Sequence, residues 1–112
     1  MIAVAASFDE WDVLVRCEAN GHAGMAKSGN DIVCAAVSVL LRGMARAVTG
    51  KNGIFAEISA PKRGSFLFQA TYKEEGRDFL FAAGIFLFEG LKSVAEEFPE
   101  YCSVTVKHLK KK

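Results

Sequence analysis

The segment from Arg77 to Phe98 constrains the fold most, because it predicts a long helix that is apolar nearly all round. Its large apolar side chains are Phe79, Leu80, Phe81, Ile85, Phe86, Leu87, Phe88, Leu91 and Val94. One face of a sheet can cover only one stripe of such a helix. We therefore expect a second surface to cover the remaining phenylalanines, and a symmetric homodimer is the simplest solution. The alternative is cover by a loop or by another helix of the same chain.

Alternation of apolar and polar residues predicts short strands in much of the remaining chain. The segment Trp11–Ala19 would place Trp11, Val13, Val15, Cys17 and Ala19 on one inward face. The other predicted strands are Ile2–Ser7, Ile54–Ser59, Ser65–Tyr72 and Tyr101–Lys107. The segment from Asp31 to Thr49 predicts a helix, with an acceptor side chain at its start and Gly50 just past its end.

The order of these elements is β-β-α-β-β-α-β. It predicts an α+β fold in which a mostly antiparallel sheet of about five strands is covered by two helices. The chain has 112 residues, so we expect one domain over residues 1–112. The order of the strands within the sheet does not follow from the pattern.

The composition and net charge of the chain disfavour several classes of protein. The chain is 51% apolar and 24% charged, as in a folded soluble protein, and its net charge of +1 gives no broad surface for nucleic acid. The start of the chain has no basic leader, and its longest strongly apolar stretch, Phe79–Phe88, is well short of the about 20 residues that span a bilayer. We expect a cytoplasmic protein that does not insert into membranes.

Three cysteines, Cys17, Cys34 and Cys102, are widely spaced and include no CxxC pair. This pattern fits neither a disulfide framework nor a zinc site, so we expect no metal. Cys17 and Cys102 alternate with apolar residues on inward strand faces, which predicts inert packing. Cys34 differs. With Asp31 as the N-cap it is the third residue of the helix, where backbone N–H groups and the helix dipole favour a thiolate.

A histidine precedes this helix by a short glycine-rich loop. His22 follows the predicted strand, and Gly21, Gly24 and Gly29 give the loop from Asn20 to Asn30 the freedom to bring an imidazole over the helix N-terminus. A cysteine nucleophile needs such a base, and the resulting imidazolium can protonate a leaving amine.

Each of these residues also has a purely structural interpretation. A histidine after a strand is usually a surface residue, and a cysteine in a first helical turn is usually packing. Asp31 is a good N-cap, worth about 1 kcal/mol, whatever else it does. Ser38 lies one turn after Cys34, and its hydroxyl can simply bond to a backbone carbonyl. Residue types and spacing alone do not decide between these interpretations.

Two runs of sequence favour the catalytic interpretation: Gly21-His22-Ala23, and Gly29-Asn30-Asp31-Ile32-Val33-Cys34-Ala35-Ala36-Val37-Ser38. Together they closely resemble the signature of the bacterial ribosomal-processing cysteine proteases (Prp). The resemblance covers Gly21 to Ser38, and the chain length and element order are also similar to that family. Within the matched runs we find no departure, although the residues from Met25 to Ser28 have no individual match.

The resemblance implies a cysteine endopeptidase with Cys34 as nucleophile and His22 as general base and acid. Asp31 matches the acidic position of the family and would orient His22 or cap the helix, and Ser38 matches a supporting serine. The implied substrate is the N-terminal extension of large-subunit ribosomal protein twenty-seven, removed during ribosome assembly. The family also implies an α+β homodimer that needs no cofactor.

Two other function classes stay open. A non-catalytic module that docks on a ribosomal precursor or an assembling particle would use the basic end, Lys107–Lys112, on RNA phosphates, although such an end is often a solvated tail. A thiol redox sensor is disfavoured because no cysteine lies near Cys34 in the sequence to resolve a sulfenic acid. Otherwise we expect no specific nucleic-acid partner.

Overall fold

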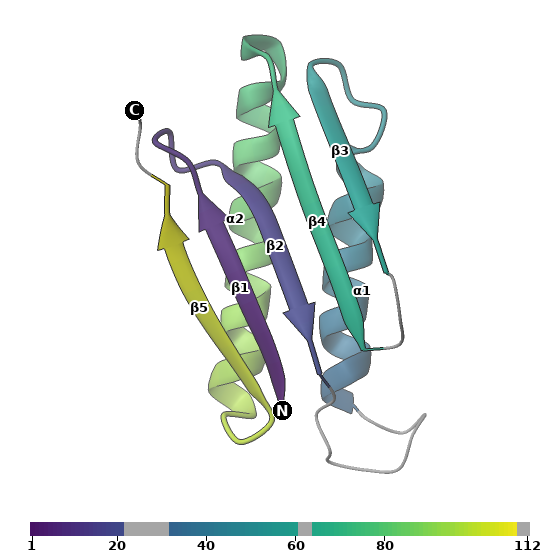
Figure 1. The fold of residues 1–112 in the computed structure, drawn as a ribbon, viewed down its shortest axis with the longest axis vertical. Coiled ribbons are helices and arrows are strands. Elements are labelled where there is room, and N and C mark those ends of the chain that lie inside the picture. Colours follow the sequence, from purple (N-terminus) through teal and green to yellow (C-terminus); the bar gives the residue numbers. More distant parts are fainter. Residues whose placement is uncertain (22–31, 61–63, 110–112) are drawn as a thin grey trace.

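Five strands form one sheet, and two helices lie on one of its faces (Figure 1). The computed structural model describes residues 1–21, 32–60 and 64–109. The strands are β1 (Ile2–Phe8), β2 (Leu14–Asn20), β3 (Ile54–Ser59), β4 (Ser65–Tyr72) and β5 (Cys102–His108). The helices are α1 (Ile32–Val48) and α2 (Glu74–Glu97). The predicted α+β class and element order are confirmed, and β3 and β4 have the predicted bounds.

The strand order is β3-β4-β2-β1-β5. Three neighbouring pairs are antiparallel, whereas β1 and β5 are parallel, so the sheet is mixed rather than fully antiparallel. The parallel pair arises because α2 carries the chain from β4 across the sheet to its far edge. Both helices therefore connect strands that run in the same direction, and β3 and β5 are the two edges.

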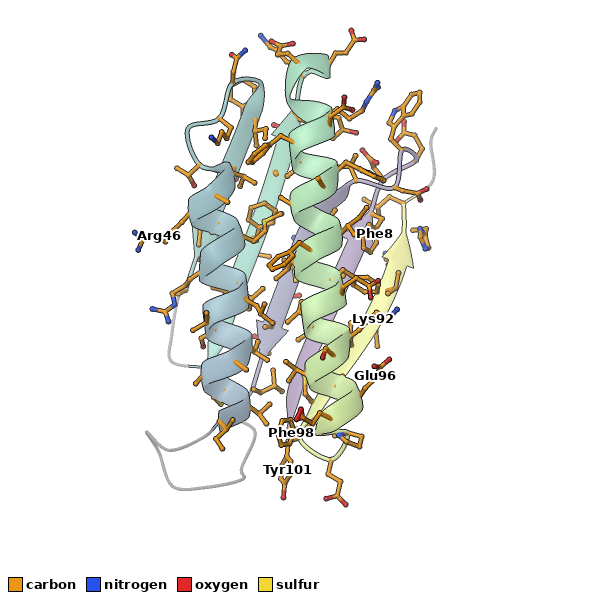
Figure 2. All side chains as sticks on the ribbon, turned by 180° about the vertical axis from the view of Figure 1, so that it is seen from behind. Phe8, Arg46, Lys92, Glu96, Phe98 and Tyr101 are labelled. Carbon is orange, nitrogen blue, oxygen red and sulfur yellow. The ribbon has the colours of Figure 1, made fainter. Side chains whose placement is uncertain are left out.

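The core lies between the sheet and the helix layer. Every second residue of β1 points into it, and the buried residues of the helices lie on the stripes that face the sheet. Among the core side chains with almost no exposed surface are Val4, Val33, Phe68, Leu80 and Leu87. The two helices lie side by side over this core (Figure 2). Gly90 of α2 faces Leu40 of α1, and a Cβ there would lie 2.8 Å from the Cδ2 atom of that leucine.

Trp11 is the clearest difference from the expected strands. It was expected on the inward face, but its side chain is 55% exposed and its ring lies under the Arg77 guanidinium, 4.9 Å away. The reason is a local turn: one carboxylate oxygen of Asp9 accepts the backbone N–H groups of Trp11 (2.9 Å) and Val13 (3.0 Å). The turn makes the connection between the first two strands longer than predicted, and β2 therefore begins at Leu14 and not at Trp11.

The long helix α2 begins at Glu74, three residues before the predicted start, and exposes a large part of its apolar surface. Phe86 is 76% exposed, and Phe79, Phe81 and Ile85 are also on the surface. Cover by α1 or by a described loop therefore does not account for these side chains. In the described ranges, no helix combines the length and the apolarity needed to cross a membrane.

Gly76 and Gly53 pack backbone against backbone where α2 begins. A Cβ on Gly76 would lie 2.5 Å from the carbonyl oxygen of Gly53, which already accepts the N–H of Lys73. We expect Gly76→Ala to lower the free energy of unfolding by about 1–3 kcal/mol, because the close approach must open. Gly43→Ala is the matched control. Among the described residues, no atom lies within 4 Å of a Cβ placed on Gly43, so alanine should stabilise the helix by up to about 1 kcal/mol. Equal effects in urea unfolding would contradict this packing.

Candidate active site

Cys34 lies in the first turn of α1, where the sequence places it. Its side chain is half-buried and packs against the edge of the core. Val33 and Val37 beside it are buried, whereas Ser38 one turn later is exposed. The thiol therefore lies at the border between the apolar and polar faces of the helix and is not enclosed by hydrocarbon.

The other two cysteines have a different environment. Cys17 is fully buried on β2, and burial raises the pKa of its thiol to about 12. Cys102 on β5 is also buried, and the pKa of its thiol is raised by the same loss of solvation. Their predicted role as inward packing residues is confirmed.

Ser38 is exposed on α1, about 40° around the helix from Cys34. Its backbone carbonyl accepts the Nε–H of Arg42 at 3.3 Å. The residue therefore shares a face with Cys34, and a supporting role for its hydroxyl in catalysis stays a prediction.

Gly21, the residue directly after β2, is held in place by close contacts with two other parts of the chain. Its φ is +106°, and a Cβ would overlap the carbonyl oxygen of Met1, so only glycine fits. Its N–H donates to the carbonyl of Gly64 at 2.8 Å, and the hydroxyl of Ser65 donates to the side-chain oxygen of Asn20 at 3.1 Å. The β3–β4 hairpin therefore anchors the residue that precedes His22. Sequence reasoning missed this contact, because nothing local links Gly64 to Gly21.

The remaining predicted site residues, His22, Gly24, Gly29 and Asp31, lie outside the described residues. What the structure gives is the placement of their neighbours: the end of β2 and the start of α1 lie at the same end of the molecule (Figure 1). The pairing of His22 with Cys34 thus stays a prediction from the sequence. In the part of the chain that is described, no group of three His, Cys, Asp or Glu side chains is placed to hold a metal ion.

A half-buried cysteine in the first turn of a helix stands at a position from which a thiol can act as a nucleophile. The sequence model of the cysteine protease Prp family matches residues 1–103. The chain therefore belongs to the family of ribosomal-processing cysteine proteases, and it is a cysteine protease.

Solved structures agree with this fold. The essential ribosomal processing protease Prp from S. aureus, in complex with a covalently linked product peptide, has a TM-score of 0.84 and 24% identity, covering 96% of this chain and 100% of that one. The same protease with a substrate peptide gives 0.78 and 23%, with the same coverage. A protein from Streptococcus mutans gives 0.78 and 22%, covering 97% and 96%. No curated protein matches the chain significantly.

The contrast between the three thiols predicts selective alkylation. A thiol with a pKa of about 12 is almost entirely protonated at pH 7.5, and the thiolate is the form that reacts. We expect brief iodoacetamide treatment to modify Cys34 and to leave Cys17 and Cys102 unmodified, whereas the denatured chain should be modified at all three. Peptide mass mapping measures this. Faster labelling of Cys17 or Cys102 in the native protein would contradict the assignment.

Proposed function

We propose that this protease removes the N-terminal extension of large-subunit ribosomal protein twenty-seven, with Cys34 as nucleophile and His22 as general base and acid. Three observations support the proposal. The motif residues occur at the family spacing, the family model spans them, and Cys34 occupies the first turn of α1 with its thiol half-buried. The last of these carries the chemistry, because it gives the sulfur both access to substrate and the field of a helix N-terminus.

The proposed reaction has two steps. His22 accepts the thiol proton of Cys34, and the thiolate attacks the scissile carbonyl carbon to form a tetrahedral intermediate. The backbone N–H groups that open α1 point toward this end of the helix and can donate to the oxyanion. The imidazolium then protonates the leaving amine, the C–N bond breaks, and a thioester remains. Water, deprotonated by the neutral His22, hydrolyses the thioester and restores the thiol.

The supporting residues have narrower proposed roles. Asp31 orients His22 or caps α1, and Ser38 supports the site from the next turn. Gly21 has a role that the described contacts support: it holds the chain between Met1 and Gly64 directly before His22. For Gly24 and Gly29 the proposed role rests on the sequence alone: they would let a peptide reach Cys34.

The direct test is incubation of the purified protein with the full-length ribosomal precursor. We expect a single cut that releases the N-terminal extension, detected as the corresponding loss of mass. A non-catalytic docking module predicts binding of the precursor without any cut, and that result would overturn the proposal.

We include in the proposal a homodimer formed through the outer face of the helix layer. The exposed apolar side chains of α2, Phe79, Ile85 and Phe86, support it, and α1 adds Val39, which is 60% exposed. Apolar surface of this kind is usually covered by a partner. A second copy is the occupant that symmetry supplies most simply.

Phe86→Ser should therefore weaken the dimer by at least about tenfold while leaving the fold of each subunit intact, because the side chain is 76% exposed. Sedimentation equilibrium at micromolar concentration measures the change. Phe55→Ser is the control, since this side chain is 56% exposed and lies on the face of the sheet opposite to the helices. A wild-type protein that is strictly monomeric at that concentration would refute the dimer.

A further inference from the structure

A groove lies between α1 and the β3 edge of the sheet, on the side of α1 away from α2. It has a volume of about 470 Å³ and is lined mainly by apolar atoms. Its lining residues are Arg42, Ala45, Arg46, Thr49, Ile58 and Phe66. Figure 2 shows Arg46 projecting from α1 away from α2, on this side of the molecule.

The groove continues the helix face that carries Cys34. Cys34, Ser38 and Arg42 follow each other at four-residue intervals, so they lie on one side of α1. With a rise of 1.5 Å per residue, Arg42 lies about 12 Å along the axis from Cys34, and Arg46 about 18 Å. The groove therefore lies farther along α1 than Ser38, on the side toward which the row from Cys34 to Arg42 turns.

The residues that line the groove offer both apolar contacts and hydrogen-bond donors to a peptide. Ile58 is 42% exposed and offers an apolar contact beside Phe66, whereas the hydroxyl of Thr49 bonds to the carbonyl of Ala45 at 2.6 Å. Along the described ranges, neither Arg42 nor Arg46 forms an ion pair with a carboxylate. The guanidinium N–H groups of Arg42 and Arg46 can donate to peptide carbonyls, and the apolar side chains of the groove can bury a peptide side chain.

The outer edge of β3 is a further place where a peptide could bind beside the groove. β3 pairs only with β4 among the described strands, so its outer edge presents backbone N–H and C=O groups. An extended peptide can add to such an edge, and every second side chain then points to the helix side of the sheet. That side is where the groove lies.

We propose that this groove is a remote substrate subsite, in which an extended peptide lies along β3 and buries one apolar side chain against Ile58 and Phe66. An extended chain rises about 3.3 Å per residue, so the buried side chain is four or five residues from the cleaved bond. The inference rests on the proposed function, because it takes Cys34 as the point of cleavage. It assigns specificity to residues of α1, β3 and β4 that lie far from the reacting atoms.

The test compares Ile58→Ser with Val106→Ser on a peptide that spans the N-terminal extension and the first residues of the mature protein. Val106 is similarly exposed at 44%, but it lies on β5, at the opposite edge of the sheet from β3. We expect Ile58→Ser to lower kcat/KM by about tenfold, the effect of losing one apolar contact in a pocket, and Val106→Ser to leave it unchanged.

An alanine scan of the peptide then locates the contact. In the wild-type protein, alanine at one position, four or five residues from the cut on one side, should lower kcat/KM by about tenfold. In Ile58→Ser the same change should matter by less than about twofold, because the contact is already lost. Wild-type cleavage with no position coupled to Ile58 would overturn the subsite and leave the proposed function standing. A wild-type protein that cleaves no peptide would overturn the proposed function itself.

Discussion

His22→Ala is expected to lower kcat for precursor cleavage by about 10³–10⁴-fold. In the proposed mechanism the variant loses the group that removes the thiol proton and protonates the leaving amine, and general acid–base catalysis of the step that limits kcat contributes up to about 10⁴-fold. Steady-state kinetics with a peptide that spans the cleavage site measures the loss.

A structural role for His22 predicts a different pattern. If the residue only shaped the loop, added imidazole would not restore activity, and the alkylation rate of Cys34 would be unaffected by the substitution. If it acts as base, millimolar imidazole should restore part of kcat, and alkylation of Cys34 near neutral pH should slow. Retention of full activity by His22→Ala would remove it from the mechanism.

Cys34→Ala is expected to have the larger effect, a loss of at least about 10⁴-fold in kcat, because no other group forms the covalent intermediate. Its effect on stability should be small, since the side chain is only half-buried and the substitution removes one sulfur atom. Binding of the precursor should persist, as measured by fluorescence anisotropy with a labelled peptide.

Cys17→Ala is the matched control for that variant. Its thiol is fully buried, so alanine leaves a small cavity and should lower the unfolding free energy by about 1 kcal/mol. Activity per folded molecule should be unchanged, because Cys17 lies on β2 within the core. We therefore expect Cys34→Ala to lower activity with little effect on stability, and Cys17→Ala to lower stability with little effect on activity.

Much of the fold is predictable because its signals are local. The bounds of β3 and β4 follow from alternation, and the position of Cys34 in the first turn of α1 follows from the pattern around Asp31. The alternation pattern wrongly predicts an inward-facing Trp11, and the reason is also local. The side chain of Asp9 binds two backbone N–H groups and forms a turn, and the alternation pattern carries no information about that competition.

The remaining features depend on contacts between distant parts of the chain. The parallel pairing of β1 with β5 is set by the path of α2, and the anchoring of Gly21 depends on Gly64. Arg46 and Ile58 line the groove from two different elements, α1 and β3, so the groove exists only once these elements have packed together. Periodicity describes one element at a time, so it cannot specify any of these pairs.

Whether the sulfur of Cys34 performs the cleavage can be measured by titrating that sulfur against activity. The wild-type protein is treated with increasing iodoacetamide, and each sample is assayed for precursor cleavage and for the fraction modified at Cys34 by mass spectrometry. We expect activity to fall in direct proportion to that fraction and to vanish at one modification per chain. A protein fully modified at Cys34 that still cleaves the precursor at its original rate would contradict this expectation.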